Sequence, residues 1–304
     1  METNLTFYKD RSVKACLSDA WKIIALNWKA YFKQLFPYLL FAGLTAAFLL
    51  EVVLQYAGEQ AMPAYLLFMS DGDAETARWV ACPSAITTIY IVLTWGLFLF
   101  GGLCYKARLT DTMHTFVQEG TILKKSISVQ LGKTERNYMK RAFIIATLFL
   151  IAFVIVASIL GWLAVKFSRW LSVAILLWGL YILPAYKQAA IQYTLLGKGL
   201  KKSVLSGLKH AWGIPFILLI LSGILTAIAN AAALMPVVVY TLSKLAAAQS
   251  NWAGDGWNMP AYLTMVGFLI NTFCFAISCL INSYVWWTLS LKEGMRVPHP
   301  LPII

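Results

Sequence analysis

The apolar parts of this chain contain almost no ionisable side chains, and Glu51 is the exception. Proton relays and ion-coupled pathways inside membranes are built from such residues, so a lone carboxylate stands out. Glu51 lies four residues before Gln55, which ends the first long apolar stretch. Two interpretations follow: Glu51 contacts a substrate or forms part of a gate, or it reaches water at the end of its helix.

Neutral polar residues form two regularly spaced sets in later apolar stretches. These are Ser222, Thr226 and Asn230 in one set, and Asn271, Ser278 and Asn282 in the other. The spacings of four and seven residues bring the members of each set to one helix face, and we expect both faces to point into a helix bundle. They would serve either as hydrogen bonds between helices or as the wall of a polar cavity for an amphipathic substrate.

Recognisable catalytic motifs are missing from the sequence. The three histidines, His114, His210 and His299, have no second histidine or cysteine at metal-ligand spacing. The sequence contains no G-x-S-x-G elbow, no Walker loop and no G-x-G-x-x-G fingerprint. We therefore expect a protein without enzymatic activity, metal or cofactor.

The elements that must position these residues are membrane helices. The chain of 304 residues is 60% hydrophobic and only 12% charged, which is far from the composition of a soluble domain. About 20 apolar residues in a helix cross a bilayer. Six stretches meet this length, so we predict an all-α polytopic membrane protein with spans at about 36–55, 85–105, 142–165, 170–186, 214–234 and 262–291.

Lysine and arginine are distributed unevenly between the two sides of this predicted topology. The segment up to Lys33 has 6 of them, 106–141 has 8, 187–209 has 5 and the tail has 2, which makes 21 of the 25. Because positive charge marks cytoplasmic loops, we expect both termini to be cytoplasmic. The predicted organisation is a cytoplasmic arm at 1–35, a six-helix domain at 36–291 and a proline-rich tail at 292–304.

A weak internal repeat groups the six spans into three hairpins. Arg11-Ser12-Val13 with Leu17, Ala20 and Trp21 recurs as Lys202-Ser203-Val204 with Leu208, Ala211 and Trp212, and a partial copy starts at Lys125. Each copy predicts a basic amphipathic segment before a hairpin. In the arm, such a helix would either lie at the membrane surface or pack on the cytoplasmic ends of the bundle. The residues that would contact headgroups are Lys14, Lys22, Lys29 and Lys33, and the interfacial anchors would be Trp21, Trp28 and Trp212.

The two long loops expected on the non-cytoplasmic side are 57–84 and 243–260. In the second loop Trp252 and Trp257 flank Gly254-Asp255-Gly256, which is typical of a turn anchored at the headgroups, although a ligand-binding loop is also compatible. Pro236 should end or kink the fifth helix. Of the five cysteines, Cys82 alone is expected outside the membrane on the non-cytoplasmic side.

Ser18-Asp19-Ala20-Trp21 and Asn27-Trp28-Lys29-Ala30-Tyr31-Phe32, followed by a membrane span, resemble one group of bacterial proteins. These are the membrane domains associated with glycerophosphoryl diester phosphodiesterases and related six-helix inner-membrane proteins. The catalytic barrel of the fused members, about 250 residues long, has no counterpart in this chain. The resemblance therefore implies a membrane role without hydrolysis, and it transfers no site residues.

The function expected from the sequence is that of a non-enzymatic bacterial inner-membrane protein in envelope upkeep. It would bind anionic membrane lipids or hold a membrane-protein partner through its basic cytoplasmic helices. The alternative is a permease or exporter of a small amphipathic molecule, which would use the polar stripes and Glu51. The net charge of +12 is explained by the asymmetry of the loops, so nucleic-acid binding is not expected.

Overall fold

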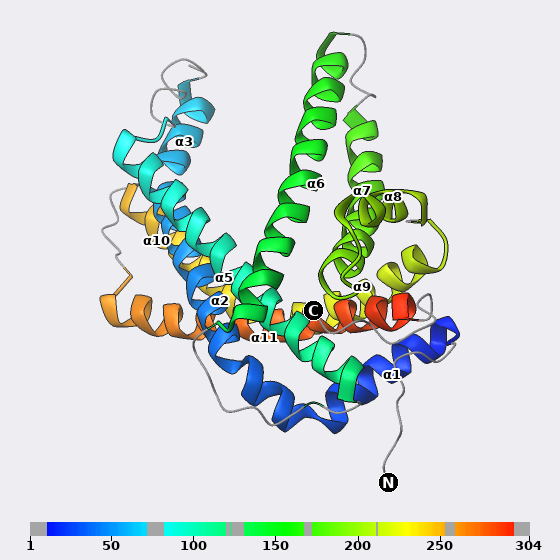
Figure 1. Ribbon diagram of the computed structural model, residues 1–304. Helices are drawn as coiled ribbons and strands as arrows, with labels where there is room; N and C mark the ends of the chain where they lie inside the picture. The colour runs from blue at the N-terminus through cyan, green and yellow to red at the C-terminus, as the bar shows by residue number, and fades with distance from the viewer. Residues whose placement is uncertain are drawn as a thin grey trace. The chain divides into compact units, whose positions relative to one another are not determined.

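The computed structural model describes residues 11–71, 82–119, 122, 131–166, 172–210, 212–252 and 259–294. Over these ranges the regular structure is helical and no strand occurs. Six helical stretches are long and apolar enough to cross a membrane (Figure 1): Trp28–Leu67, Ala85–Val117, Lys133–Leu163, Val173–Thr194, Ile214–Ala233 and Ala261–Glu293. The prediction of an all-α chain with six such helices is confirmed.

The helices fall into two compact units. In chain order they are α1 (Val13–Leu26), α2 (Trp28–Tyr56), the π-helical η1 (Ala57–Ala61), α3 (Met62–Asp71), α5 (Ala85–Glu119), α6 (Lys133–Lys166), α7 (Ser172–Thr194), α8 (Leu200–His210), α9 (Ile214–Ala233), α10 (Met235–Trp252) and α11 (Ala261–Gly294). Unit 1 comprises Met1–Phe36, Leu103–Ala227 and Asn282–Ile304, and unit 2 comprises Pro37–Gly102 and Ile228–Ile281. The limits of the units fall inside α2, α5, α9 and α11.

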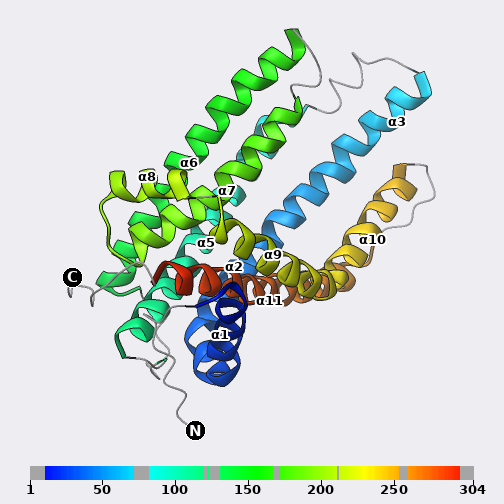
Figure 2. The ribbon, with the colours of Figure 1, turned by 90° about the vertical axis from the view of Figure 1, so that its right-hand side faces the viewer.

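Unit 1 is built around α6, α7 and α8. Figures 1 and 2 both show α6 and α7 side by side, and their contact buries Ile145, Phe149 and Ile182. α8 approaches α7 closely because Gly207 has no side chain: a Cβ there would lie 2.6 Å from the carbonyl oxygen of Ala185. Small residues at a helix contact, here Gly207 on α8 and Ala185 on α7, allow the two backbones to approach closely in membrane proteins.

Unit 2 uses the same device where α2 meets α11. A Cβ added at Gly43 would clash with the carbonyl oxygen of Thr272 and lie 3.0 Å from the backbone nitrogen of Ala276. Ala47, one turn further along α2, is fully buried. The pattern of small residues four apart on α2, with Thr272 and Ala276 four apart on α11, is typical of helices that pack through their backbones.

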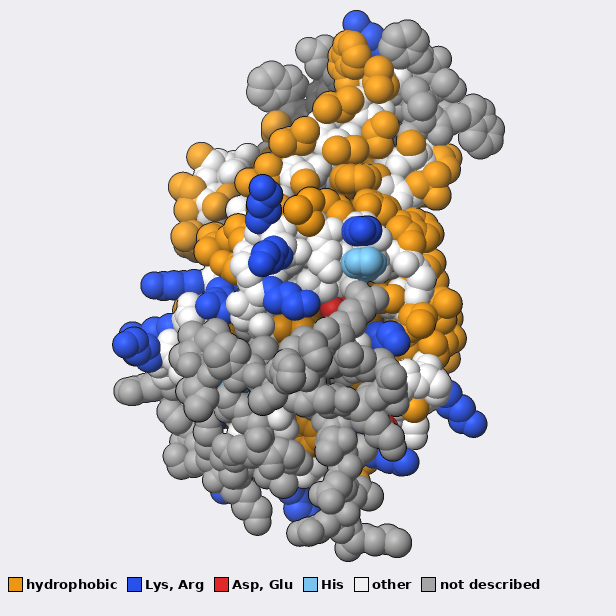
Figure 3. All heavy atoms as spheres, turned by 45° about the vertical axis from the view of Figure 1, so that its right-hand side comes forward, with side chains coloured by type: hydrophobic (Ala, Val, Ile, Leu, Met, Phe, Trp, Pro, Cys, Tyr) orange, Lys and Arg blue, Asp and Glu red, His pale blue; other side chains and the backbone are white. Residues whose placement is uncertain are grey.

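The outward faces of the apolar helices remain exposed. On α6, Leu150, Ile151 and Ile155 are each more than half exposed. Figure 3 shows hydrophobic side chains dominating the upper part of the face that it draws, while lysines and arginines gather lower down. Exposed aliphatic side chains along a helix are stable against lipid, whereas soluble monomers rarely expose large apolar patches.

Several helices extend beyond the predicted spans, and the expected loops at 57–84, 106–141 and 243–260 are partly helical. α5 continues to Glu119 and α6 begins at Lys133, so much of the expected loop at 106–141 is helix. η1 and α3 occupy 57–71, and α10 occupies Met235–Trp252. Pro236 lies in the first turn of α10, where its missing N–H costs no helix bond. The tail beyond Gly294, the partial repeat at Lys125 and the turn at 253–258 lie outside the described residues.

Candidate functional site

The arm folds as α1 and the first turns of α2. The side chain of Ser12 accepts a hydrogen bond from the backbone nitrogen of Ala15 at 3.3 Å and so caps α1. Asn27 separates the two helices and donates its side-chain amide to the carbonyl oxygen of Ile23 at 3.0 Å. α2 then runs through position 35 without interruption, so no helix boundary separates the predicted arm from the first predicted span.

The arm has one packed face and one exposed face. In α1 the buried residues are Cys16, Ala20 and Ile23, which recur at helical spacing. Trp21, beside this face, is 64% exposed, and Trp28 at the start of α2 is 58% exposed. The four predicted headgroup residues, Lys14, Lys22, Lys29 and Lys33, are all exposed. The large apolar side chains of the arm are therefore divided between the two faces, because Tyr31 and Leu35 are buried while Trp21 and Trp28 are exposed.

The packed face is fixed to the end of α11. The hydroxyl of Tyr284 donates to the carbonyl oxygen of Leu17 at 3.1 Å, and the indole nitrogen of Trp287 donates to the hydroxyl of Tyr31 at 3.1 Å. Trp287 is fully buried. These contacts hold one face of the arm against the end of α11 and leave its lysines and two tryptophans on the other face.

Trp212, the third predicted anchor, precedes α9 and is 57% exposed. Its ring lies 6.0 Å from the ring of Tyr181 and 4.8 Å from that of Phe216. Tyr181 also donates its hydroxyl to the carbonyl oxygen of Leu208 at 3.0 Å. The anchor therefore belongs to an aromatic stack that joins α7, the end of α8 and the start of α9.

The residues of the two polar stripes have different environments. Ser222 and Thr226 are buried and donate to carbonyl oxygens of their own helix, Leu218 at 2.6 Å and Gly223 at 3.0 Å respectively. Asn230 and Ser278 are partly buried. Asn282 is exposed, in contrast to the expectation that its stripe points inward, because one face of a long helix meets different neighbours along its length.

Asn271 has the most unusual environment of the six. It is fully buried in unit 2, and neither its amide nitrogen nor its amide oxygen has a hydrogen-bond partner in the described part of the chain. A buried amide without a partner is costly, and in native proteins such groups are rare. Asn271 is therefore the stripe residue with the greatest capacity to bind a further polar group.

Glu51 has two partners on α10, far away in the sequence. Its carboxylate accepts a hydrogen bond from the hydroxyl of Tyr240 and forms an ion pair with the ammonium of Lys244. Both charged side chains are partly buried. Burial raises the pKa of Tyr240, and the hydrogen bond to Glu51 and the charge of that carboxylate raise it further. The phenol therefore stays protonated at neutral pH and acts as a donor.

This cluster lines a cavity of about 910 Å³ in unit 2. The wall is formed by α2, η1, the start of α5 and α10, which Figure 2 shows running beside α2. It combines aromatic and aliphatic side chains, among them Phe48, Tyr90 and Val52, with the polar cluster. The side-chain oxygen of Gln60, also in the wall, has no hydrogen-bond partner among the described residues. Such a cavity can hold an amphipathic molecule, with its polar group at Glu51 and Lys244.

Sequence reasoning identified Glu51 but missed Tyr240 and Lys244. Lys244 was placed in a loop, and nothing local in the sequence links it to a residue 193 positions away. The π-helical turn at Ala57–Ala61 was also missed, although such turns frequently occur at functional sites. Across the described residues, no group of three or more His, Cys, Asp or Glu side chains is placed to hold a metal ion.

Comparisons with protein-family models, with curated proteins and with solved structures found no match for this chain. The resemblance to phosphodiesterase-associated membrane domains therefore stays a prediction.

Proposed function

We propose that this chain is a non-enzymatic, multi-pass protein of the bacterial inner membrane, with both termini cytoplasmic. It associates with anionic phospholipids through the exposed face of the arm and so acts as a lipid-associated scaffold or factor in membrane homeostasis. The proposal includes membership of the group of phosphodiesterase-associated membrane domains that the arm resembles. As a scaffold, the chain would hold a membrane-protein partner.

The observation that carries this proposal is the division of the arm into two faces. α1 buries small and aliphatic residues on one side and exposes indole rings and lysines on the other. The ammonium of Lys29 lies 5.9 Å from the centre of the Trp28 ring. Exposed tryptophans beside lysines are typical of helices at the headgroup level, where the rings bury apolar surface and the ammonium groups contact phosphate.

Lipid selectivity can be measured with the tryptophans of the protein itself. The protein is reconstituted in phosphatidylcholine vesicles, and increasing fractions of brominated phosphatidylglycerol or brominated phosphatidylcholine are introduced. Stronger quenching by the brominated anionic lipid is expected for the wild type. The variant Lys14→Glu, Lys22→Glu, Lys29→Glu, Lys33→Glu should lose this preference, because each basic residue near the surface contributes about 1 kcal/mol.

A charge-conserving variant is the matched control. The four Lys→Arg substitutions at the same positions should retain the preference for the anionic lipid. Replacing Trp21 and Trp28 by Phe should remove the preferential part of the quenching, since these rings are the reporters nearest the lysines. Equal selectivity in the wild type and the Lys→Glu variant would contradict the proposal.

A second function, that of a permease or exporter for a small amphipathic molecule, is favoured by the cavity around Glu51. This function is tested by measuring whether water-soluble reagents reach the wall of the cavity. In a background with the native cysteines replaced, Thr87→Cys and Ala248→Cys place thiols in the wall, and Ala47→Cys places one at a buried control position. A water-soluble thiol reagent should modify the first two only. Failure to modify either wall position would rule out a water-filled pathway there.

A further inference from the structure

A second large cavity lies in unit 1, between the first turns of α6 and the end of α7. Its volume is about 900 Å³. The described residues that line it include four basic side chains of α6 and no carboxylate; the basic residues are Lys133, Arg136, Lys140 and Arg141. His114 of α5 and the polar side chains of Thr134 and Asn137 complete this part of the wall. The proposed lipid contacts of the arm do not use any of these residues.

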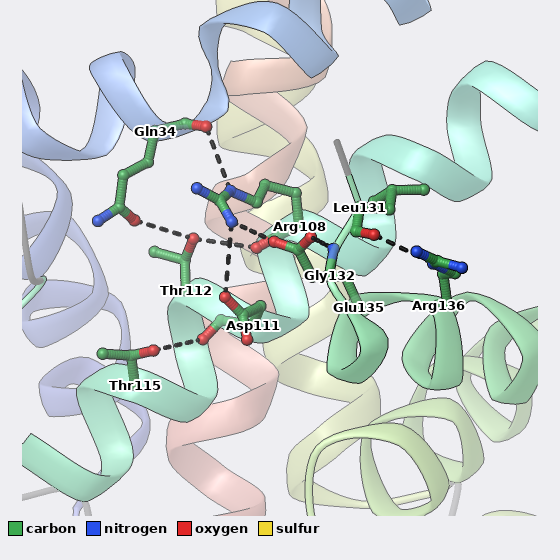
Figure 4. A network of polar contacts seen from close by, with 9 residues as sticks. All are labelled: Gln34, Arg108, Asp111, Thr112, Thr115, Leu131, Gly132, Glu135 and Arg136. Carbon is green, nitrogen blue, oxygen red and sulfur yellow. Dashed lines mark hydrogen bonds and ion pairs between the residues drawn. The ribbon is translucent and has the colours of Figure 1, made fainter. Parts of the chain in front are cut away.

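The spacing along α6 explains why the wall is so basic. Positions 133, 136, 137, 140 and 141 recur at three- and four-residue steps and therefore share one helix face. Glu135, the acidic residue of the first turn, points to the other side of the helix. Its carboxylate accepts a hydrogen bond from the backbone nitrogen of Gly132 at 2.7 Å and forms a buried ion pair with Arg108 of α5, as Figure 4 shows.

Arg108 is held in this position by further contacts. Its guanidinium donates to the carbonyl oxygen of Gln34 at 3.4 Å and lies 3.7 Å from the carboxylate of Asp111 (Figure 4). The carboxylate of Glu135 is thus paired with Arg108 in the interior of unit 1. The four cations on the opposite face have no carboxylate among the described residues that share their cavity.

The facing wall is the end of α7. Gly197 adopts a φ of 64°, a left-handed conformation that favours glycine, and the backbone nitrogen of Lys198 donates to the carbonyl oxygen of Gln192 at 3.0 Å. Arg141 donates to the carbonyl oxygen of Tyr193 at 3.4 Å and lies over its ring. These contacts join α6 to α7 and fix one guanidinium in the wall.

The remaining cations are available to a ligand. Arg136 donates through Nε to the carbonyl oxygen of Leu131 at 3.1 Å, which orients its guanidinium (Figure 4). Lys133 and Lys140 are exposed and form no ion pair with any described residue. The first-turn N–H groups of α6 also point out of the helix end, which favours an anion.

We propose that this cavity binds a phosphate group. A tetrahedral anion of charge about −1.5 to −2 matches a forked guanidinium, two ammonium groups and the start of a helix better than a single carboxylate does. The apolar part of α6 begins at Ala142, directly after Arg141, so the basic wall adjoins the apolar part of the helix, and a lipid phosphate and a soluble phosphate both match its chemistry. A phosphate group is common to a lipid headgroup and to a soluble ligand, and the experiment below distinguishes the two.

The test uses the full-length protein in neutral detergent and two probes. Binding of radiolabelled inorganic phosphate is measured by equilibrium dialysis, and binding of dioctanoyl phosphatidic acid is measured by native mass spectrometry. The cavity variant is Lys133→Gln, Arg136→Gln, Lys140→Gln. The matched control is Lys201→Gln, Lys202→Gln, Lys209→Gln, which removes three exposed cations from α8 in the same unit without touching the cavity. Unchanged melting temperatures establish that both variants are folded.

The cavity variant should bind its phosphate probe at least about tenfold more weakly than the wild type, while the α8 control keeps the affinity of the wild type. Saturable binding of inorganic phosphate with this pattern identifies a soluble ligand. Binding of phosphatidic acid alone, with the same pattern, identifies a lipid headgroup. Absence of saturable binding of both probes to the wild type, or equal weakening in the two variants, overturns the proposal. The lipid selectivity of the arm is measured separately, so each proposal can fail by itself.

Discussion

Arg108 of α5 and Glu135 in the first turn of α6 form an ion pair in which both side chains are about 95% buried. Burying two charges is expensive, and their attraction repays that cost only when both are present. The pair ties the first turn of α6 to α5, and the basic residues of α6 lie on the opposite face of the helix. Stability and charge distribution at this helix start are therefore linked through one contact.

Removing one member of the pair should destabilise the protein strongly. Arg108→Met leaves Glu135 buried with a charge and without its main partner, and we expect a loss of about 3 kcal/mol. Thermal unfolding in detergent, followed by circular dichroism, measures the change. Arg136→Met, an exposed arginine one residue from Glu135, is the control and should change stability by less than about 0.5 kcal/mol.

The double variant Arg108→Met, Glu135→Leu completes this cycle. It should be considerably more stable than Arg108→Met alone, because no uncompensated charge remains. Losses that simply add would show that the two side chains do not interact.

Gly43 should not tolerate even one additional methyl group. Gly43→Ala introduces a Cβ that meets the backbone at Thr272 and Ala276, so α2 and α11 must move apart, and we expect a loss of about 2 kcal/mol. Gly96→Ala on α5 is the matched control, because nothing lies within 4 Å of a Cβ there. That variant should be neutral or gain up to about 1 kcal/mol from helix propensity. Equal effects of the two substitutions on the unfolding temperature would exclude the close contact.

The ion pair between Glu51 and Lys244 should behave as a coupled unit. Lys244→Met should lower the unfolding temperature more than the double variant Glu51→Gln, Lys244→Met, since the single change leaves a partly buried carboxylate whose remaining partner on α10, among the described residues, is the hydroxyl of Tyr240. A coupling of about 1 kcal/mol is expected for side chains that keep some contact with solvent. A coupling free energy of zero in chemical or thermal unfolding would show that Glu51 and Lys244 do not interact.

Native cysteines report the orientation of the chain. Cys82 is exposed, whereas Cys16, Cys104 and Cys274 are buried. Burial also raises the pKa of the Cys16 thiol, which lowers its thiolate fraction at a given pH and slows its reaction. A membrane-impermeant maleimide added to intact cells with a permeabilised outer membrane should label the wild type but not Cys82→Ser. Labelling of Cys82 only after the inner membrane is opened would reverse the predicted topology.

Much of the fold could be predicted because a bilayer imposes length and composition on each helix. The six apolar stretches are visible in the sequence for this reason, and each overlaps a helix of the structure that is long and apolar enough to cross a membrane. Helix ends were predicted less well, because a helix such as α5 continues past its apolar part into charged residues up to Glu119. α10 was missed because Pro236 was interpreted as the end of one helix and not as the first turn of the next.

The candidate sites depend on pairing between distant residues, which local patterns do not encode. The exposed lysines and tryptophans of the arm were selected from the sequence because their types and spacing suggest a membrane surface, and their contact with lipid stays a prediction. The partners of Glu51 and Arg108 could not, because Lys244 and Glu135 lie in segments that were expected to be solvated loops. The basic face of α6 could not be predicted for the same reason. Residues three and four apart share a face only in a helix, and 133–141 was expected to be a loop.

The most direct test of the central claim is the lipid retained by the purified protein. Wild type and the arm variant with Lys14, Lys22, Lys29 and Lys33 changed to Glu are extracted in mild detergent and compared by native mass spectrometry. We predict that the wild type carries phosphatidylglycerol or another anionic phospholipid, and that the variant loses most of it. Identical lipid occupancy in both proteins, or retention of a discrete non-lipid ligand that is indifferent to the lysines, would contradict the lipid-binding function and favour the permease.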